Sequence, residues 1–185
     1  MHLSRTWYYA DFYVYPAVAA GLTAHAVLTL PARGVAGWAA WAVVGLALWT
    51  LVEYGMHRIV FHRIAYFDRM HEVHHHSPVE MIGTPVWLSG MAMAAVLLPL
   101  WLAFGERFAS GFGTGMIVGY FWYMVVHHAT HHWVVDHRSY FYAAKRRHAL
   151  HHHICPDQNF GVTTDFWDMV FGTAFRRDKT RPRQA

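Results

Sequence analysis

Cysteine and charge are both scarce in this sequence of 185 residues. The single cysteine, Cys155, cannot form an internal disulfide, so the fold does not depend on an oxidising compartment. Charged residues make up 14% of the chain, against about 25% in ordinary soluble domains. There is also no Gly-x-Gly-x-x-Gly motif, and one cysteine is too few for an iron–sulfur cluster. These shortages exclude a disulfide scaffold and argue against a free-standing soluble protein.

Hydrophobic residues make up 55% of the chain and gather in four stretches that have the length of membrane-spanning helices. A stretch of 19 residues rises about 28 Å as a helix, close to the hydrocarbon thickness of about 30 Å. Buried helices of a soluble bundle are the alternative, but four such stretches would leave too little polar surface to cover them. We therefore expect one all-α integral membrane domain over residues 1–185, with spans at residues 12–30, 35–54, 86–104 and 111–128.

Positive charge is divided unevenly between the two ends of these spans. Short turns at 31–34 and 105–110 would join the spans into two hairpins, and each turn carries one cation, Arg33 or Arg107. The other 13 of the 15 cations fall at the opposite ends. The positive-inside rule therefore predicts a multi-pass protein with both termini in the cytosol, in a bacterial inner membrane or the endoplasmic reticulum membrane. The net charge of +4 fits this topology and indicates no nucleic-acid partner.

On the cytosolic side we expect a helical cap formed by residues 57–85 and 129–175, followed by a basic tail, 176–185, near anionic lipid. Residues 140–153 are expected to be helical. The segment 165–172 mixes acids with large apolar groups, a pattern that favours a position along the membrane surface.

Histidine is the residue in excess, and 15 of the 17 histidines fall in two windows, 57–76 and 127–153. Both windows lie at the cytosolic ends of predicted spans. Residues three and four apart share a helix face, so three groups can each point imidazoles toward one place: His71/His74/His75, His128/His132 and His148/His151/His152. His57 and His62 are five apart, about 140° around a regular helix. They share a site only if the helix bends or ends between them.

Converging imidazoles indicate metal, because neutral imidazole binds iron, zinc, copper and nickel well. One ion takes three to five such ligands, so about ten histidines are enough for two ions. Solvated histidines or a loose metal-buffering tract are the alternatives, but a tract would lack the repeated helical spacing. Residues 71–75 also fit the His-Glu-x-x-His pattern of zinc peptidases, in which Glu72 would be the general base. That pattern leaves most of the histidines unexplained.

Taken together, these motifs resemble the fatty acid hydroxylase / sterol desaturase superfamily of integral membrane diiron oxygenases. The resemblance runs from about Val52 to Thr173 and includes a closing segment, Asn159-Phe160-Gly161 through Trp167-Asp168 to Phe171-Gly172-Thr173. His127 and His131 compete with His128 and His132 one register away. The second pair is preferred, because a histidine follows five residues later at 137 as in fatty acid 2-hydroxylases. The metal-binding and catalytic residues that the resemblance implies are His57, His62, His71, His74, His75, His128, His132, His148, His151 and His152.

The resemblance also implies two iron ions, O2 and a separate electron donor of the cytochrome b5, ferredoxin or reductase type. Zinc can replace iron in the purified protein. The expected reaction hydroxylates an unactivated C–H bond of a lipid from the bilayer, of fatty acyl, sphingolipid, sterol or carotenoid type. Desaturation by the same superfamily stays open, as does a non-enzymatic metal carrier or transporter, although a transporter should place its ligands near the middle of the membrane. No oligomeric state is predicted.

Acidic side chains near the histidines are candidates for orienting the imidazoles. Glu53 lies one turn before His57 and is placed to accept its ring N–H, with a solvated or helix-capping carboxylate as the alternative. His2 and His25 lie outside the two windows and are expected not to bind metal. The further acidic candidates are Glu72, Asp136, Asp165 and Asp168.

Overall fold

The computed structural model describes residues 1–176 of the chain. In this part the secondary structure is helical, and the only β pairing is an isolated bridge between His2 and Ile82. The predicted tail lies outside the described residues except for Arg176. The helices are α1 (Arg5–Thr29), α2 (Ala32–Gly55), the π-helix η1 (Met56–Phe61), α3 (Ala65–His76), α4 (Val86–Phe104), α5 (Glu106–His132), α6 (Tyr140–His153) and α7 (Phe166–Val170).

Four helices are long and apolar enough to cross a membrane: α1, α2 with its continuation η1, α4 and α5. The expectation of an all-helical chain with four such helices is confirmed. The helix α4 has the predicted bounds, whereas α1 and α5 extend beyond the apolar runs that predicted them. The helix α1 begins at Arg5 because the side chain of Ser4 accepts a hydrogen bond from the backbone N–H of Trp7 and caps the first turn.

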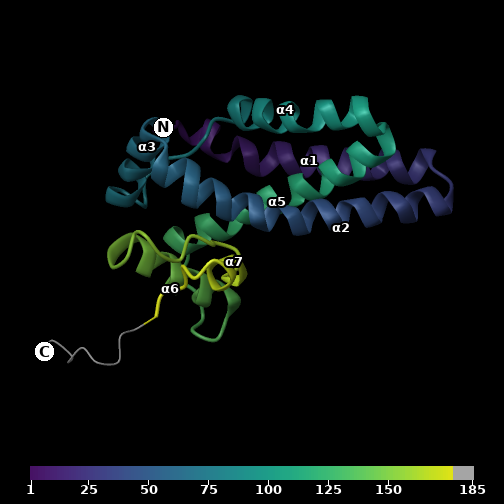
Figure 1. The fold of residues 1–185 in the computed structure, drawn as a ribbon. Coiled ribbons are helices and arrows are strands. Elements are labelled where there is room, and N and C mark those ends of the chain that lie inside the picture. Colours follow the sequence, from purple (N-terminus) through teal and green to yellow (C-terminus); the bar gives the residue numbers. More distant parts are fainter. Residues whose placement is uncertain (177–185) are drawn as a thin grey trace, which may run out of the picture.

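Two tight turns join these helices in pairs. Leu30 and Pro31 connect α1 to α2, and Gly105 connects α4 to α5 with a φ of +81°, a conformation that glycine tolerates without strain. Figure 1 shows both turns at one end of the helix bundle, with the N-terminus and α3 at the other end. A crossing of the bilayer as two hairpins, with a cytosolic cap, stays a prediction.

The helix α5 lies at the centre of the bundle and packs most extensively against α2. Glycines spaced four apart on α5 make this contact close: a Cβ on Gly115 would lie 1.9 Å from the carbonyl oxygen of Ala42, and one on Gly119 would overlap Trp49. In α2, Gly45 meets the backbone of Phe112 in the same way. Small residues at four-residue spacing allow membrane helices to approach this closely. The approach brings the histidine-bearing end of α5 beside the end of α2.

Candidate metal centre

Nine histidines form two groups whose candidate ligand nitrogens lie within 4.8 Å of one another. The first histidine cluster combines residues of η1 and its C-terminal end, α3 and α6, and the second combines residues of α3, α5 and α6. Each cluster therefore draws on both histidine windows of the sequence. The first histidine cluster consists of His57, His62, His71, His75 and His151, and the second of His74, His131, His148 and His152.

The π-helix η1 explains how His57 and His62 reach the same cluster. A regular helix would turn these two side chains about 140° apart, since they are five residues apart. In a π-helix the hydrogen bonds run from i to i+5, so residues five apart lie above one another. The helix changes from α to π after Gly55, and His62 ends it. As a result, the ring centroids of His57 and His62 are 5.2 Å apart.

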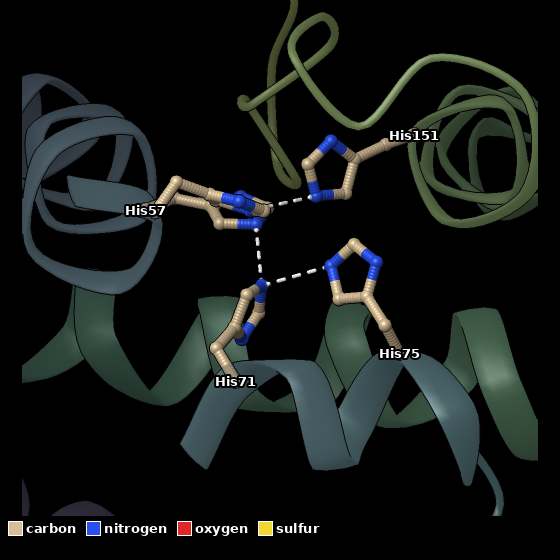
Figure 2. A group of neighbouring side chains, drawn as sticks. His57, His71, His75 and His151 are labelled. Atoms are coloured by element: carbon tan, nitrogen blue, oxygen red, sulfur yellow. Dashed lines mark hydrogen bonds between the residues drawn. The ribbon is translucent and has the colours of Figure 1, made fainter. Parts of the chain in front are cut away.

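The imidazoles of the first histidine cluster present their Nε2 atoms to one another, as Figure 2 shows for four of them. The Nε2 atom of His71 lies 3.0 Å from that of His57 and 3.1 Å from that of His75. The Nε2 atoms of His62 and His151 are also 3.1 Å apart. Two nitrogens bound to one ion at about 2.1 Å are separated by roughly 3.0–3.4 Å. The spacing therefore fits a shared metal ion.

Backbone carbonyls fix which nitrogen of two of these rings carries the proton. The Nδ1 atom of His57 faces the carbonyl oxygen of Phe160 at 2.5 Å, and that of His151 faces the carbonyl oxygen of Gln158 at 2.8 Å. A carbonyl oxygen can only accept, so Nδ1 is the donor and the Nε2 of each neutral ring keeps its lone pair. Lone pairs that face one another in a buried site call for a cation, and this arrangement is typical of metal-ligating histidines.

The second histidine cluster has the same character. The Nε2 atoms of His148 and His131 are 2.9 Å apart, and the Nε2 of His127 lies 3.1 Å from that of His74. Both ring nitrogens of His152 are buried without a hydrogen-bond partner among residues 1–176. Buried polar atoms are costly to leave unpaired. A metal ion would satisfy these nitrogens, and His127 is placed to serve as a fifth ligand of this cluster.

The expected pair His128 and His132 lies outside both clusters. His128 stacks on His132, with ring centroids 4.3 Å apart, and its Nδ1 is 2.9 Å from the hydroxyl oxygen of Tyr8 in α1. Each step along a helix rotates the side chain by about 100°. The pair one residue earlier, His127 and His131, therefore faces α3 and α6, and the preferred pair faces α1.

Burial keeps the cap histidines neutral. It is the largest cause that lowers the pKa of His75 to about 3 and the pKa values of His74 and His151 to about 4. Burial also lowers the pKa values of His71, His148 and His152, and neighbouring imidazoles lower them further. Neutral imidazole is the form that binds metal. The site is thus ready to ligate an ion at neutral pH.

The loop after α6 orients His57 from behind. The predicted contact of Glu53 with His57 is not formed. Instead, the Glu53 carboxylate accepts hydrogen bonds from the backbone N–H groups of Val162 and Thr163, at 2.9 and 2.8 Å, and from the Thr163 hydroxyl at 2.6 Å. Glu53 therefore acts through the loop that supplies the Phe160 carbonyl to His57.

Asp168 holds the other side of this loop. Its buried carboxylate accepts hydrogen bonds from the N–H groups of Phe160 and Gly161, at 2.9 and 2.8 Å, and from the hydroxyl of Thr173 at 2.7 Å. Gly161 has no room for a side chain, since a Cβ would lie 2.0 Å from the carbonyl oxygen of Thr164. The closing segment of the sequence is thus held in place by Asp168, and its Phe160 carbonyl contacts His57 of the first histidine cluster.

The remaining acidic candidates do not touch the clusters. Glu72 pairs with the exposed His76, and Asp136 accepts the backbone N–H of Arg138. Asp165 precedes α7 and makes no side-chain cap there. The hydrogen bonds of Glu53 and Asp168 to the loop that contacts His57 distinguish these two acids from the others.

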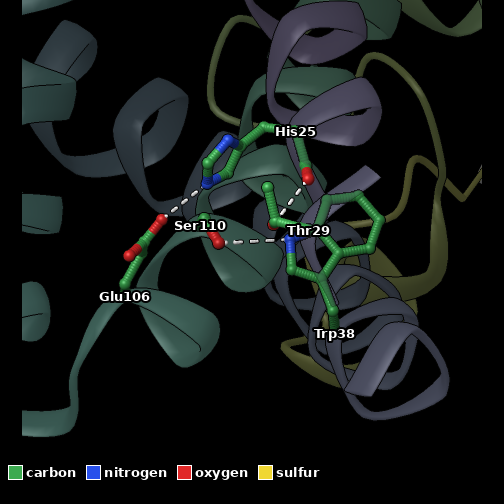
Figure 3. Close-up of polar contacts among 5 residues, drawn as sticks. All are labelled: His25, Thr29, Trp38, Glu106 and Ser110. Carbon is green, nitrogen blue, oxygen red and sulfur yellow. Dashed lines mark hydrogen bonds and ion pairs between the residues drawn. The ribbon is translucent and has the colours of Figure 1, made fainter. Parts of the chain in front are cut away.

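The two histidines outside the windows belong to neither cluster. His25 pairs with Glu106 at 2.9 Å near the turns that join the helices, beside a hydrogen bond from Trp38 to Ser110 (Figure 3). His2 pairs with Glu80 at 3.0 Å, and both side chains of this pair are exposed. Neither histidine belongs to a metal-binding group among the described residues.

Comparison with known proteins agrees with the geometry. A dihydroceramide fatty acyl 2-hydroxylase of Arabidopsis thaliana is 32% identical over 140 residues, which cover 70% of this chain and 58% of that protein. A fatty acid 2-hydroxylase of Rattus norvegicus is 32% identical over 143 residues, covering 71% of this chain and 38% of that protein. The chain therefore spans less than two thirds of these curated relatives.

A solved structure of full-length scs7p, in which only the hydroxylase domain is visible, superimposes with a TM-score of 0.80 and 25% sequence identity. The superposition covers 91% of this chain and 67% of that one. Together with its four membrane-length helices, this likeness supports an integral membrane protein. The sequence model of the family described as "Fatty acid hydroxylase" matches residues 42–173. This chain therefore belongs to the fatty acid hydroxylase family.

Proposed function

We propose that this protein is an O2-dependent membrane hydroxylase that inserts oxygen into an unactivated C–H bond of a lipid, using two iron ions held by ten histidines. The observation that carries the proposal is the pair of histidine clusters, within each of which the candidate ligand nitrogens lie within 4.8 Å of one another. Two clusters of this size offer ligands for two ions. The proposed ligands are the five histidines of the first cluster and the four of the second, together with His127.

Bound iron would supply the redox chemistry that reduces O2 with two electrons from a separate donor. In the overall reaction one oxygen atom enters the C–H bond as a hydroxyl and the other leaves as water, which consumes two electrons and two protons. The chain contributes the setting. Hydrogen bonds from the Nδ1 groups of His57 and His151 to carbonyl oxygens leave both Nε2 atoms free to bind metal. Burial of His57, His148 and His151 would limit the access of water to the centre.

The relatives favour a fatty acyl or ceramide-type substrate. The proteins reported above are named as a dihydroceramide fatty acyl 2-hydroxylase and a fatty acid 2-hydroxylase, and a further relative from Saccharomyces cerevisiae, 32% identical over 148 residues, is named as a ceramide very long chain fatty acid hydroxylase. These names favour hydroxylation over desaturation for this chain. A metal carrier is disfavoured because both clusters lie at one end of the helix bundle.

Metal analysis and lipid analysis test the proposal together. The wild-type protein, purified from cells grown with iron, should contain about two metal ions per chain, and lipids of the expressing cells should gain hydroxylated fatty acyl groups in mass spectra. His71→Ala, His75→Ala and His151→Ala should each lose both the metal and the product. His2→Ala and His25→Ala serve as controls and should keep both.

Metal-free wild-type protein, or full metal content in the three cluster variants, would overturn the assignment of the centre. Wild-type protein that binds two ions but yields no oxidised lipid would instead favour the carrier. A new double bond in place of a hydroxyl would identify a desaturase.

A further inference from the structure

A second feature of the protein lies beside the metal centre, on the other face of the helix that carries His57. The last turns of α2, the π-helix η1 and the end of α7 border a pocket of about 460 Å³ that is open to the surface. Arg58 and Arg63 line it together with the apolar side chains of Leu51, Ile59 and Phe171. The metal centre uses none of these residues.

The two arginines have no acidic partner among residues 1–176, where the ion pairs all involve histidine. The Arg58 guanidinium donates a 2.9 Å hydrogen bond to the hydroxyl of Tyr54 and lies 6.0 Å from the centre of the Phe160 ring. The Tyr54 hydroxyl is hydrogen-bonded to the Thr173 hydroxyl, which donates to Asp168. The Asp168 carboxylate also accepts two backbone N–H groups, so it does not pair with Arg58. Two positive charges in a small pocket therefore remain unneutralised, which is the electrostatic requirement of an anion site.

The rim of the pocket is apolar on the side where the helix leaves its membrane-length stretch. Ile59 is 58% exposed and Phe171 is 49% exposed, and Phe166, Met169 and Val170 of α7 are exposed beside Phe171. The indole N–H of Trp167 donates to Thr50 at 2.9 Å and fastens α7 against α2. Exposed apolar groups next to unpaired arginines match the two parts of a lipid at the membrane boundary, an acyl chain and a charged head group.

We propose that this pocket binds the phosphate group of an anionic membrane phospholipid, with Arg58 and Arg63 on the phosphate and with Leu51, Ile59 and Phe171 against the upper acyl chains. Basic pockets beside membrane helices recognise lipid head groups in this way. The site is independent of the proposed hydroxylation, since it shares no residue with the histidine clusters. A lipid bound there would bridge α2 and α7 and so brace the loop that orients His57.

Native mass spectrometry of the intact protein in detergent tests this site. The probes are phosphatidylglycerol and phosphatidylcholine with identical acyl chains. We expect the wild type to bind phosphatidylglycerol in preference, and Arg63→Gln to weaken that binding about five-fold, the effect of one interfacial cation. Arg58→Gln should do at least as much, and Arg63→Lys should retain most of the binding. Arg33→Gln, an exposed arginine at the opposite end of α2, is the matched control and should bind as the wild type does.

Arg63 is the decisive position because its side chain makes no hydrogen bond or ion pair in the described part of the chain, so its replacement leaves the fold intact. Equal binding of the two lipids by the wild type, or unchanged phosphatidylglycerol binding in Arg63→Gln and Arg58→Gln, would overturn the proposal. Displacement of phosphatidylglycerol by millimolar inorganic phosphate would also overturn it, since that result identifies a site for free phosphate.

Discussion

The chemistry of the proposed centre is decided by single ring nitrogens. Two imidazoles have their tautomers fixed by carbonyl oxygens, and those carbonyls belong to Phe160 and Gln158 in the loop after α6. Eight of the ten histidines that form or adjoin the clusters are among those expected from the sequence, and the other two positions, His127 and His131, depended on helix phase. The spacing i, i+4 is the same for His127/His131 and for His128/His132, so sequence alone could not separate the pairs. The direction of α1 and α6 relative to α5 separates them.

The register of α5 gives the sharpest residue-scale prediction. We expect His131→Ala to lose metal and activity, because its Nε2 lies 2.9 Å from that of His148 inside the second histidine cluster. The adjacent variant His132→Ala is the matched control and should keep its metal, since His132 stacks on His128 outside both clusters. Metal content by plasma mass spectrometry checks both. The reverse result would restore the pair that the sequence favoured.

The buried histidines also predict how stability depends on pH. In the folded, metal-free chain the pKa of His75 is lowered to about 3 and those of His74 and His151 to about 4, against an ordinary histidine pKa of 6.5. Between these values the unfolded chain binds more protons than the folded chain, so the free energy of unfolding falls as the pH falls. The contribution is fully present above pH 6.5 and is lost progressively below it.

Thermal unfolding of the metal-free protein in detergent should therefore show a midpoint that drops steadily from pH 7 to pH 5. His75→Gln removes one titrating ring and should have a shallower dependence. A midpoint that stays constant or rises over this range would show that the rings are not buried in the neutral form.

At the scale of helices, three features shape the site, and the sequence reveals them to different extents. The presence of four membrane-length helices follows from the apolar runs, and α4 has the predicted bounds. The π-helix at 56–61 has no local sequence signal, and it brings the rings of His57 and His62 to 5.2 Å from one another. The spacing of His57 and His62 predicted only that the helix must bend or end between them if the two residues share a site. The contact of α2 with α5 was not predicted, although glycines at 111, 115 and 119 are its signal.

The close contact of α2 and α5 can be tested with one methyl group. A Cβ on Gly115 would lie 1.9 Å from the Ala42 carbonyl oxygen, and a backbone atom cannot turn aside as a side chain can. We expect Gly115→Ala to lower the free energy of unfolding by about 1–3 kcal/mol, the cost of overpacking. Metal affinity should fall with it, since α5 carries His127 and His131 to the second cluster.

Gly37→Ala is the control within α2, because nothing lies within 4 Å of the position of its Cβ. Alanine is the better helix former, so this variant should be as stable as the wild type or more so. Equal unfolding midpoints for the two variants would show that α2 and α5 do not meet at this distance.

At the scale of the whole molecule, the site depends on which end of the bundle faces the cytosol. Both histidine clusters lie at the end away from the two turns. In the sequence, 13 of the 15 cations fall outside those turns. A protein that donates electrons from one side of the membrane must reach this end. Charge asymmetry predicts that the end is cytosolic, so the turns with Arg33 and Arg107 should face the opposite compartment.

Cysteine labelling checks this orientation directly, because the chain offers a single natural thiol. Cys155 is partly exposed just after α6, at the histidine end, and Ala32 is exposed in the turn before α2. In bacterial spheroplasts a membrane-impermeant maleimide should label Ala32→Cys, made in a Cys155→Ser background, before lysis. The wild-type Cys155 should react only after lysis. Labelling in the opposite order would place the clusters outside the cytosol, and a cytosolic electron donor could then not serve them.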